Sequence, residues 1–279
     1  MMNNHDQVRP VNHNAVMITG AAGGLGKAFA VECASRGWDL FLTDLHPEPL
    51  ETLARGLCRA YGVHVAVHAC DLTDLDSRTG LFKRIAGDGL RFWGLFNVAG
   101  MDFEGPFYEQ SRQHIRTIVR LNIEGTLEMT HAIMAYRDPT LPFRIINVAS
   151  LAAFYPMPVK ATYAASKRFL MDFSLALRNE LSEMGVTVTV LCPAGMPTTR
   201  ECVRAIDAQG FLGQLTTQNT GSVANLTLNA ALKGDAICIP GRLTQVRLEV
   251  QRQLAVVLYQ PTGQRRITGS GWVRIAGGR

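Results

Sequence analysis

The chain has 279 residues, of which 47% are hydrophobic, and its formal net charge is +5. This length suits one large α/β domain or two small ones. No run of 18 or more apolar residues occurs, so the sequence predicts no membrane-spanning helix. The first 14 residues are polar, and we expect them to form a flexible tail rather than a signal peptide.

The positive charge is concentrated near the end of the chain. From Gly241 onward, seven arginines accompany a single acid, Glu249, whereas the rest of the chain carries 21 basic and 22 acidic side chains. Because the main body is nearly neutral, this distribution argues against a nucleic-acid-binding protein with a basic surface. The six cysteines stand singly, which favours reduced thiols in a cytoplasmic protein and predicts no metal site.

Short β-rich runs alternate with longer helical patterns along the chain. One helical pattern covers Leu25–Ser35, and another covers Tyr163–Glu183 and ends near Gly185, a residue suited to a helix C-cap. This alternation predicts an α/β fold, a single Rossmann-like, doubly wound domain over 15–241 with a mostly parallel seven-stranded sheet. The predicted strands are Ala15–Thr19, Asp39–Thr43, Val63–Ala69, Trp93–Val98, Phe143–Val148, Val186–Leu191 and Ala236–Ile239.

The last third of the chain departs from this alternation. Residues 196–232 hold no clear strand, and we expect helices there. The seventh strand is assigned to Ala236–Ile239 rather than to the tail from Ile267, because the later choice would interrupt the sheet with a long excursion. Residues 242–279 predict a basic helical extension, in which 242–259 have an amphipathic pattern. We expect this helix to pack on the domain or a partner subunit; a lid over the substrate cleft and a membrane-surface contact are the alternatives.

A glycine-rich turn lies between the first strand and the first helix. Gly20, Gly24 and Gly26 have the spacing G-x-x-x-G-x-G. Glycine permits a tight turn and lets a diphosphate approach the backbone, while the helix N-terminus offers free N–H groups to the anion. A phosphate-loop NTPase is excluded, because that motif needs glycine at position 21 and a hydroxyl residue at position 28, where this chain has Ala21 and Ala28.

Asp44 ends the second strand, 18 residues after Gly26. A carboxylate at this place accepts hydrogen bonds from both ribose hydroxyls and repels a 2′-phosphate. No lysine or arginine stands in the glycine turn before Gly26 or directly after Asp44. The sequence therefore favours NAD(H) over NADP(H), and a loop or helix-capping acid is the alternative interpretation of Asp44.

A tyrosine and a lysine, Tyr163 and Lys167, stand four residues apart. On a helix this spacing is about one turn, so both side chains point the same way. A free phenol has a pKa of about 10, and a neighbouring ammonium group favours the phenolate. Ser150 ends the fifth strand, where its hydroxyl can hydrogen-bond a substrate oxygen or simply cap the following turn.

Taken in order, these motifs resemble those of the short-chain dehydrogenase/reductase family over about residues 15–240. The run from Thr19 to Gly26 matches the family's TGxxxGxG turn, and Ser150, Tyr163 and Lys167 match its catalytic trio. There are two departures, since Val98 replaces the second asparagine of the NNAG segment and Ala194 replaces the glycine after Pro193. The further matches are Asp71-Leu72 at the family's adenine site, Asn97-Val98-Ala99-Gly100 at its NNAG segment, Asn122 at its water-holding helix asparagine, and Pro193 with Thr198 at its nicotinamide-bordering segment.

The resemblance implies an NAD(H)-dependent oxidoreductase that interconverts a secondary alcohol and a ketone, as a homodimer or homotetramer. Tyr163 would be the general acid/base, Lys167 would lower its pKa and hold the nicotinamide ribose, and Asn122 would relay protons through water. The implied catalytic residues are Ser150, Tyr163, Lys167 and Asn122. The implied cofactor-binding residues are Gly20, Gly24, Leu25, Gly26, Asp44, Asp71, Leu72, Asn97, Ala99, Gly100, Tyr163, Lys167, Pro193 and Thr198.

The loop between Ser150 and Tyr163 is rich in apolar residues. With Met101, Phe103 and Met196 it indicates a hydrophobic pocket for a small alcohol or ketone, although ordinary packing beneath a loop is an equal alternative. A strongly anionic substrate is disfavoured, with Lys160 as the one exception among these loops. Two other functions stay open, an NADPH-dependent carbonyl reductase and an NAD(H)-sensing protein without turnover.

Overall fold

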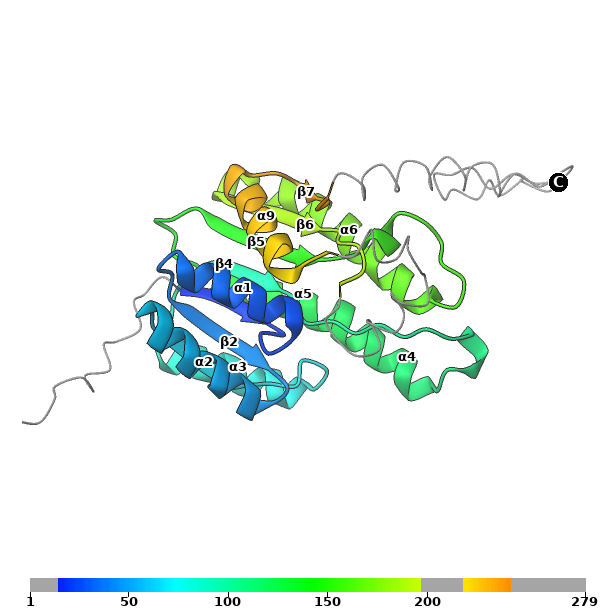
Figure 1. Cartoon of the computed structure of the whole chain (residues 1–279), viewed down its shortest axis with the longest axis horizontal. Helices are drawn as coiled ribbons and strands as arrows, with labels where there is room; N and C mark the ends of the chain where they lie inside the picture. The colour runs from blue at the N-terminus through cyan, green and yellow to red at the C-terminus, as the bar shows by residue number, and fades with distance from the viewer. Residues whose placement is uncertain (1–14, 197–217, 242–279) are drawn as a thin grey trace, which may run out of the picture.

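A computed structural model describes residues 15–196 and 218–241 of the chain (Figure 1). Its seven strands form one parallel sheet in the order β3-β2-β1-β4-β5-β6-β7. The predicted Rossmann-like α/β fold is therefore confirmed. The strands are β1 (Ala15–Thr19), β2 (Leu40–Asp44), β3 (Val65–Ala69), β4 (Phe92–Asn97), β5 (Phe143–Val148), β6 (Val186–Leu191) and β7 (Ile237–Cys238).

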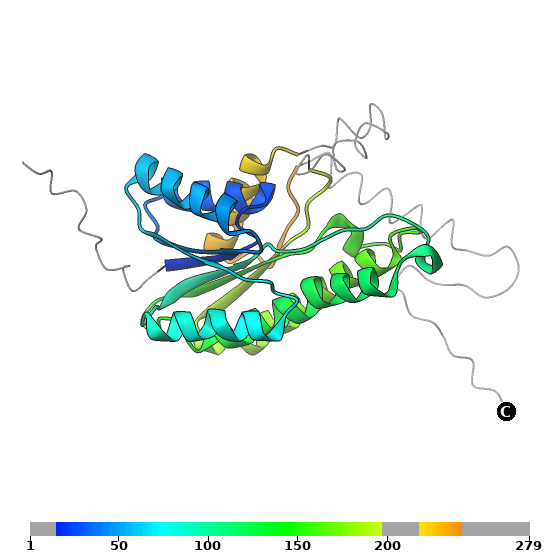
Figure 2. The ribbon, with the colours of Figure 1, turned by 90° about the horizontal axis from the view of Figure 1, so that it is seen from below.

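Helices cover both faces of the sheet, as a doubly wound fold requires (Figure 2). Crossover connections between parallel strands place helices on both sides, so the strands are buried on both faces. One face carries α1 (Gly24–Ser35), α2 (Pro47–Tyr61) and α9 (Thr220–Lys233). The other carries α3 (Leu75–Gly87), α5 (Thr126–Met134) and α6 (Ala161–Glu180), with α4 (Arg112–Val119) leading into α5 through a π-helical turn, η2 (Arg120–Gly125).

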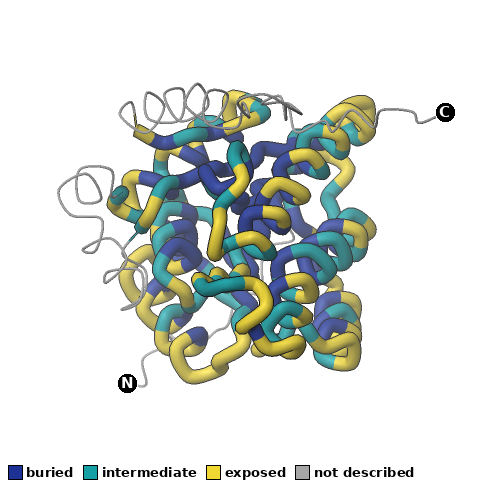
Figure 3. The backbone as a smooth tube through the Cα atoms, turned by 90° about the vertical axis from the view of Figure 1, so that its right-hand side faces the viewer, coloured by how far each residue is buried: buried dark blue, intermediate teal, exposed yellow. Residues whose placement is uncertain are grey.

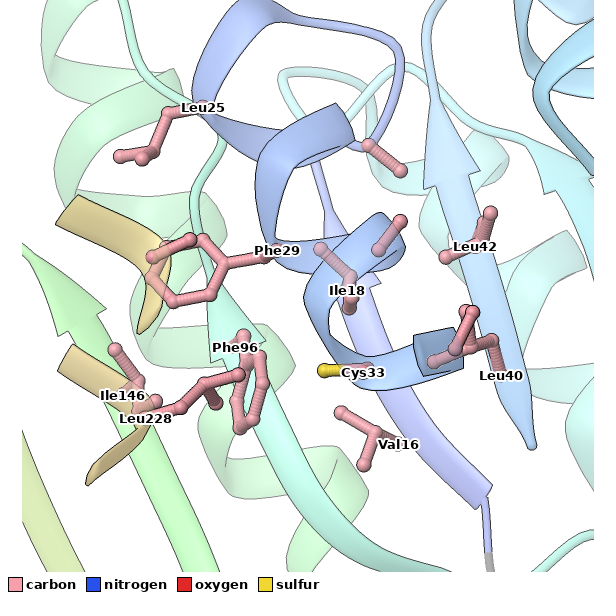
Figure 4. Close-up of a cluster of buried hydrophobic side chains, with 14 of the residues drawn as sticks. Val16, Ile18, Leu25, Phe29, Cys33, Leu40, Leu42, Phe96, Ile146 and Leu228 are labelled. Carbon is pink, nitrogen blue, oxygen red and sulfur yellow. The ribbon is translucent and has the colours of Figure 1, made fainter. Parts of the chain in front are cut away.

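Alternate residues of β1 enter the two halves of the core. Val16 and Ile18 pack with Phe29 of α1 on one face (Figure 4), whereas Met17 packs in the cluster on the opposite face. All these side chains are fully buried. The helices that cover the sheet bury one side and expose the other, which gives them bands of buried and exposed residues (Figure 3). The continuous apolar run of this strand thus follows from its position in the middle of a two-sided sheet.

A ladder of buried polar side chains crosses the carboxyl ends of β4 and β5. The amide nitrogen of Asn97 donates to Thr130 at 3.0 Å and to Asn147 at 2.8 Å, and the amide nitrogen of Asn147 donates to Ser174 at 2.9 Å. These bonds join two neighbouring strands to α5 and α6. Buried polar groups are costly unless paired, so the ladder specifies the positions of these elements where the chain leaves the sheet.

Most predicted boundaries agree with the structure within two residues. The assignment of the seventh strand to the earlier segment is confirmed by β7, and α9 lies in the region expected to be helical. The long helix α6 ends earlier than predicted, and a short 3-10 turn, Ser182–Met184, follows it and is closed by Gly185 with a φ of 70°. No helix of the described chain is long and apolar enough to span a membrane. The predictions for 1–14, 197–217 and 242–279 fall outside the described residues.

Candidate active site

Gly20 and Ala99 meet where the chain leaves β1 and β4, two neighbouring strands at which the strand order changes direction. Ligands of open α/β sheets bind in the crevice outside such a switch point. A Cβ atom on Gly20 would lie 2.7 Å from the backbone nitrogen of Ala99, and the φ of Gly20 is 63°. Both the close approach and the left-handed backbone therefore demand glycine at this position.

The start of α1 packs against the same turn. A Cβ atom on Gly26 would lie 2.0 Å from the carbonyl oxygen of Gly20, so no other residue fits without moving the helix. The helix is preceded by Gly23, which has no side chain to cap it. The first backbone N–H groups of the helix, those of Gly24 and Leu25, have no acceptor within the helix. This cradle fits a diphosphate group, which the free N–H groups and the helix dipole would attract.

Asp44 reaches back from the end of β2 to this turn. Its Oδ2 atom accepts a hydrogen bond from the Ala22 nitrogen at 2.9 Å, and its Oδ1 atom accepts one from the His46 nitrogen at 3.4 Å. The N-cap of α2 is His46, so Asp44 is not the capping residue of that helix. Its partly exposed carboxylate lies instead beside the glycine turn, where a ribose of a bound dinucleotide would be recognised.

The loop after β3 carries Asp71 and Leu72. The Oδ1 atom of Asp71 accepts hydrogen bonds from the nitrogen and the hydroxyl of Thr73, at 2.8 and 2.7 Å. This local turn holds the carboxylate in place at the carboxyl edge of the sheet. Leu72 is buried. The geometry is compatible with the predicted adenine contact, although the side chain of Leu72 packs with the core on the α3 and α5 side.

The segment Asn97–Gly100 begins with a buried residue that supports the sheet and ends with an exposed residue. Asn97 is only 4% exposed, and its amide nitrogen is used by the polar ladder, so this residue supports the sheet. The hydroxyl of Thr19 accepts hydrogen bonds from the Val98 and Ala99 nitrogens at 3.1 and 3.2 Å. These bonds tie the end of β4 to the end of β1. Gly100, which follows, is more exposed.

Asn122 lies fully buried in the π-helical turn between α4 and α5. Its side chain accepts from the Met101 nitrogen at 2.9 Å and donates to the Met101 carbonyl and to the Ser166 hydroxyl, both at 3.0 Å. Single π turns inside helices occur frequently at functional sites. Asn122 thereby joins the loop after β4 to α6, one residue before Lys167. A Cβ atom on Gly100 would lie 3.2 Å from both Asn122 Oδ1 and Lys167 Nζ.

Tyr163 and Lys167 lie on the same side of α6, as their spacing predicts. The Lys167 Nζ atom is 5.7 Å from the centre of the Tyr163 ring and donates to the Val148 carbonyl at 2.8 Å. Burial lowers the pKa of Lys167 to about 8, against the opposing effects of Asp102 and Cys192, which raise it. Tyr163 itself is partly exposed. The structure thus brings a phenol and a buried ammonium group together at the carboxyl end of β5.

Ser150 follows β5 and caps the short 3-10 turn Leu151–Ala153, because its Oγ atom accepts from the Ala152 nitrogen at 3.2 Å. The interpretation of Ser150 as a capping residue is therefore correct. Because the cap uses Oγ only as an acceptor, the hydroxyl group can still donate its hydrogen to a substrate oxygen. The Leu151 nitrogen donates to the Pro193 carbonyl at 3.0 Å, which places Pro193 beside this turn. Thr198 lies outside the described residues.

The loop residues predicted to line an apolar pocket fall into two groups. Leu151, Ala152 and Ala153 are buried, so this part of the loop is ordinary packing. Met101 and Phe103 are partly exposed; Asn122 holds the backbone of Met101, and the ring of Phe103 packs on His114 with a centroid distance of 4.5 Å. A surface hollow of about 700 Å³ lies elsewhere, along the outer sides of α1 and α2. In the described ranges, no group of three or more His, Cys, Asp or Glu side chains is placed to hold a metal ion.

Arg78 is an important residue that sequence reasoning missed. Its side chain is 1% exposed and donates to the Leu72 carbonyl at 2.6 Å, to Glu124 at 2.8 Å and to Glu128 at 2.6 Å. The two carboxylates raise the pKa of Arg78 although burial opposes them. This arginine ties the loop after β3 to the π turn of Asn122. The available signal was its spacing from the buried residues Leu81 and Ile85, which puts Arg78 on the buried side of α3.

Similarity to known proteins agrees with these observations. A family model described as short chain dehydrogenase matches residues 14–207. The chain belongs to this family. The chain is 35% identical over 201 residues to a sulfoacetaldehyde reductase of Chromohalobacter salexigens, a match that covers 68% of this chain and 76% of that one. It is 31% identical over 184 residues to the 17-beta-hydroxysteroid dehydrogenase type 3 of Homo sapiens, covering 65% of this chain and 59% of the human protein.

Solved structures give the same picture of the fold. A short-chain dehydrogenase from Sphingobium yanoikuyae in complex with NADPH is 26% identical, with a TM-score of 0.75 and coverage of 91% of this chain and 97% of that one. A short chain dehydrogenase/reductase from Burkholderia phymatum in complex with NAD is 22% identical, with a TM-score of 0.75 and coverage of 93% and 100%. By contrast, the chain spans less than two thirds of several curated relatives, for example 65% of a very-long-chain 3-oxoacyl-CoA reductase-A of Danio rerio.

Proposed function

We propose that this protein is an NAD(H)-dependent dehydrogenase that interconverts a secondary alcohol and a ketone. The observation that carries the proposal is the position of the Lys167 ammonium group, 5.7 Å from the Tyr163 ring and bonded to the last residue of β5. An acid/base phenol needs a neighbouring cation to stabilise its phenolate. Membership of the short-chain dehydrogenase family supports the same chemistry.

In the proposed mechanism, one residue transfers the proton and others position the substrate and the phenolate. Tyr163 would take the hydroxyl proton of an alcohol, or return it to a ketone, while the Ser150 hydroxyl donates a hydrogen bond to the same substrate oxygen. Lys167 holds the phenolate by charge and is itself positioned by the Val148 carbonyl. When bound, the nicotinamide cofactor supplies the group that accepts or donates the hydride. The residues proposed to hold it are Gly20, Gly24, Leu25, Gly26, Asp44, Asp71, Ala99, Gly100 and Pro193.

Asn122 is proposed to act chiefly as a positioning residue. Its amide group already bonds Met101 and Ser166, so it fixes the loop after β4 against α6. A water that relays protons would have to use the remaining lone pair of the Asn122 oxygen or the backbone of the π turn. Because Asn122 is fully buried and bonded to Ser166, we expect it to help position the neighbouring Lys167.

The preference for NAD(H) rests on Asp44. Its carboxylate is held at the glycine turn by the Ala22 nitrogen, and it would accept hydrogen bonds from a ribose and repel a 2′-phosphate. The two solved relatives were bound to different cofactors, NADPH in one case and NAD in the other. Family likeness therefore leaves the choice open, and the carboxylate supplies the argument. An NADPH-dependent carbonyl reductase is the alternative that this carboxylate disfavours.

We propose an apolar alcohol or ketone as the substrate, because Met101, which Asn122 joins to α6 next to Lys167, and Phe103 of the same loop remain partly exposed. The human relative named for a hydroxysteroid and the Danio rerio relative named for a very-long-chain acyl compound support this substrate class. The relative named for sulfoacetaldehyde does not. A cytoplasmic location and a homodimer or homotetramer stay predictions; light scattering on a size-exclusion column would test the subunit number.

The decisive experiment is a screen of alcohols and ketones followed at the absorbance of the reduced nicotinamide, with both cofactors. Tyr163→Phe is expected to lower kcat by at least about 100-fold while NADH still binds. Tyr61→Phe is the matched control, since Tyr61 is exposed at the end of α2. Near wild-type turnover by Tyr163→Phe would overturn the proposal. Tight NADH binding without turnover on any compound would instead favour an NAD(H)-sensing protein.

A further inference from the structure

Three charged side chains form a cluster beside Tyr163 that the proposed mechanism does not use. Lys160 immediately precedes α6, and its Nζ atom is 5.8 Å from the centre of the Tyr163 ring. Two carboxylates from the loop after β4 contact this ammonium group, Asp102 at 2.5 Å and Glu104 at 3.2 Å. We call Asp102, Glu104 and Lys160 the charged rim.

The rim joins the two loops that flank the phenol. Besides the ion pairs, the Gly105 nitrogen donates to the Val159 carbonyl at 2.8 Å, and Gln110 donates to the Gly105 carbonyl at 3.2 Å. Val159 has a φ of 58°, a left-handed conformation that is a genuine outlier for a β-branched residue. Such strain persists when the surroundings impose it, and it clusters at ligand-binding sites. The loops are therefore held in one arrangement next to Tyr163.

The charges of the rim leave an excess of one negative charge. Burial lowers the pKa of Lys160, but Asp102 and Glu104 outweigh burial and raise the pKa overall, so this lysine stays charged at neutral pH. It is 19% exposed, whereas the side chains of Asp102 and Glu104 are 40% and 58% exposed. Solvent-borne ligands therefore meet the carboxylates more readily than the ammonium group. The other cation near the phenol, Lys167, is also charged at neutral pH, but it is buried and bonded to Val148, whereas the carboxylates of the rim are exposed.

We propose that the charged rim makes the substrate site select uncharged carbonyl compounds against anionic ones. This inference rests on the proposed function, since it concerns the substrate of the same site. An anionic substrate would have to share Lys160 with Asp102 and Glu104, and it would approach against the excess negative charge of the rim. The rim would thus separate this protein from relatives that act on anions, such as the one named for sulfoacetaldehyde.

The expected size of the effect follows from elementary electrostatics. One net charge about 8 Å from a ligand charge, in a medium of effective dielectric constant between about 40 and 80, changes a binding constant by roughly twofold to sixfold. Salt screens exposed charges, with a screening length of about 8 Å at physiological ionic strength. Discrimination by the rim should therefore weaken as salt is added, whereas discrimination by shape should not.

A matched pair of ketones tests the inference by binding, without requiring turnover. The probes are para-acetylbenzamide, which is neutral, and para-acetylbenzoate, which is anionic and of nearly the same shape. Their Kd values for the protein with saturating NAD would be measured by calorimetry at about 20 mM and about 500 mM salt. We expect the wild-type protein to bind the amide about two to six times more tightly at low salt, with the difference closing at high salt.

Variants distinguish the effect of the charge of the rim from the effect of the net charge of the whole protein. Asp102→Asn with Glu104→Gln turns the rim positive and should reverse the preference. Glu180→Gln with Glu183→Gln makes the same change of charge at exposed positions, at the last residue of α6 and in the 3-10 turn that follows it, and should leave the preference as in the wild type. Lys160→Arg keeps the ion pairs and should also behave like the wild type. NADH binding and the unfolding midpoint of each variant report whether it is folded.

Tighter or equal binding of the carboxylate by the wild type at low salt would overturn the inference. So would an unchanged preference in the folded Asp102→Asn/Glu104→Gln variant. Failure of the proposed function gives a different result, because both ketones would bind with the ratio described while neither is reduced by NADH. The ratio of the two Kd values thus reports on the rim, and the absorbance of the nicotinamide reports on the dehydrogenase activity.

Discussion

The side-chain amide of Asn122 pairs with the backbone of Met101 in both directions, accepting from its N–H at 2.9 Å and donating to its carbonyl at 3.0 Å. The same amide also donates to Ser166 on α6. Three segments far apart in the sequence therefore meet at one buried side chain, next to Lys167. Because Ser166 directly precedes Lys167 on α6, we expect this junction to help hold Tyr163 and Lys167 in position.

Replacing Asn122 by alanine should lower kcat/KM by about tenfold to 100-fold, because the backbone groups of Met101 would lose their buried partners and the loop would shift. Stability should fall by about 1–3 kcal/mol in a denaturant titration. Asn179→Ala, at an exposed position on α6, is the control and should change neither quantity appreciably. Wild-type kinetics in the folded Asn122→Ala variant would contradict a positioning role.

Gly26→Ala should destabilise the fold by about 3 kcal/mol or more, because the added Cβ would lie 2.0 Å from the Gly20 carbonyl oxygen, which is backbone and cannot rotate away. Gly56→Ala is the control in α2, where a Cβ would meet nothing within 4 Å. There, alanine should stabilise the helix by about 0.5–1 kcal/mol. Urea unfolding of both variants measures the two effects, and equal changes in them would refute this account of the glycine turn.

Asp44→Ala should shift the ratio of NAD to NADP affinity towards NADP by about tenfold or more, since it removes both a ribose acceptor and a charge that repels a 2′-phosphate. Fluorescence titrations with NADH and NADPH measure the ratio directly. Asp88→Ala, at the end of α3 remote from the glycine turn, should leave it unchanged. A preference for NADPH already present in the wild type would count against our cofactor assignment.

Lys167→Met should abolish turnover and yet stabilise the protein without cofactor by about 3 kcal/mol near neutral pH. Burial lowers the pKa of this lysine from 10.5 to about 8, so the charged form is disfavoured in the folded state. At pH values below the pKa of about 8 in the folded state, the free-energy cost of burying the charged lysine is fully present. Between pH 8 and pH 10.5 the unfolded wild-type chain binds more protons than the folded one. Wild-type stability therefore rises with pH over this range, and the stability advantage of Lys167→Met disappears.

Denaturant titrations of the wild type and Lys167→Met at a series of pH values from neutral to strongly alkaline would show this convergence. Lys233→Met is the control, because Lys233 is exposed in the last turn of α9. Its effect on stability should be small and should not follow the same curve. A constant difference between the wild type and Lys167→Met across this range would contradict the lowered pKa.

Arg78→Lys should destabilise the protein by about 2–3 kcal/mol, since a lysine has no planar fork with which to reach Leu72, Glu124 and Glu128 at once. Arg55→Lys is the matched control, because Arg55 is 65% exposed and its ion pair with Glu51 is loose, at 3.6 Å. That change should stay within about 0.5 kcal/mol of zero. Thermal unfolding of both variants tests the contrast.

Sequence by itself determined the features of this protein that depend on neighbours along the chain. The alternation of apolar runs specified the strands and the doubly wound fold, and the glycine spacing specified the turn, because strand burial and left-handed backbone are local requirements. The same holds for Tyr163 and Lys167, which one helical turn aligns. Each of these inferences needed no knowledge of which distant segments meet.

Only the tertiary structure decided which charges and amides are partners. Lys160 and Asp102 are 58 residues apart, and Arg78 reaches acids 46 and 50 residues away, so no periodicity in the sequence connects them. It also showed Asn97 turned into the buried ladder rather than towards the crevice. The physical reason is that a hydrogen bond or an ion pair depends on distances of a few ångströms, which arise only when the sheet brings separate loops to one edge.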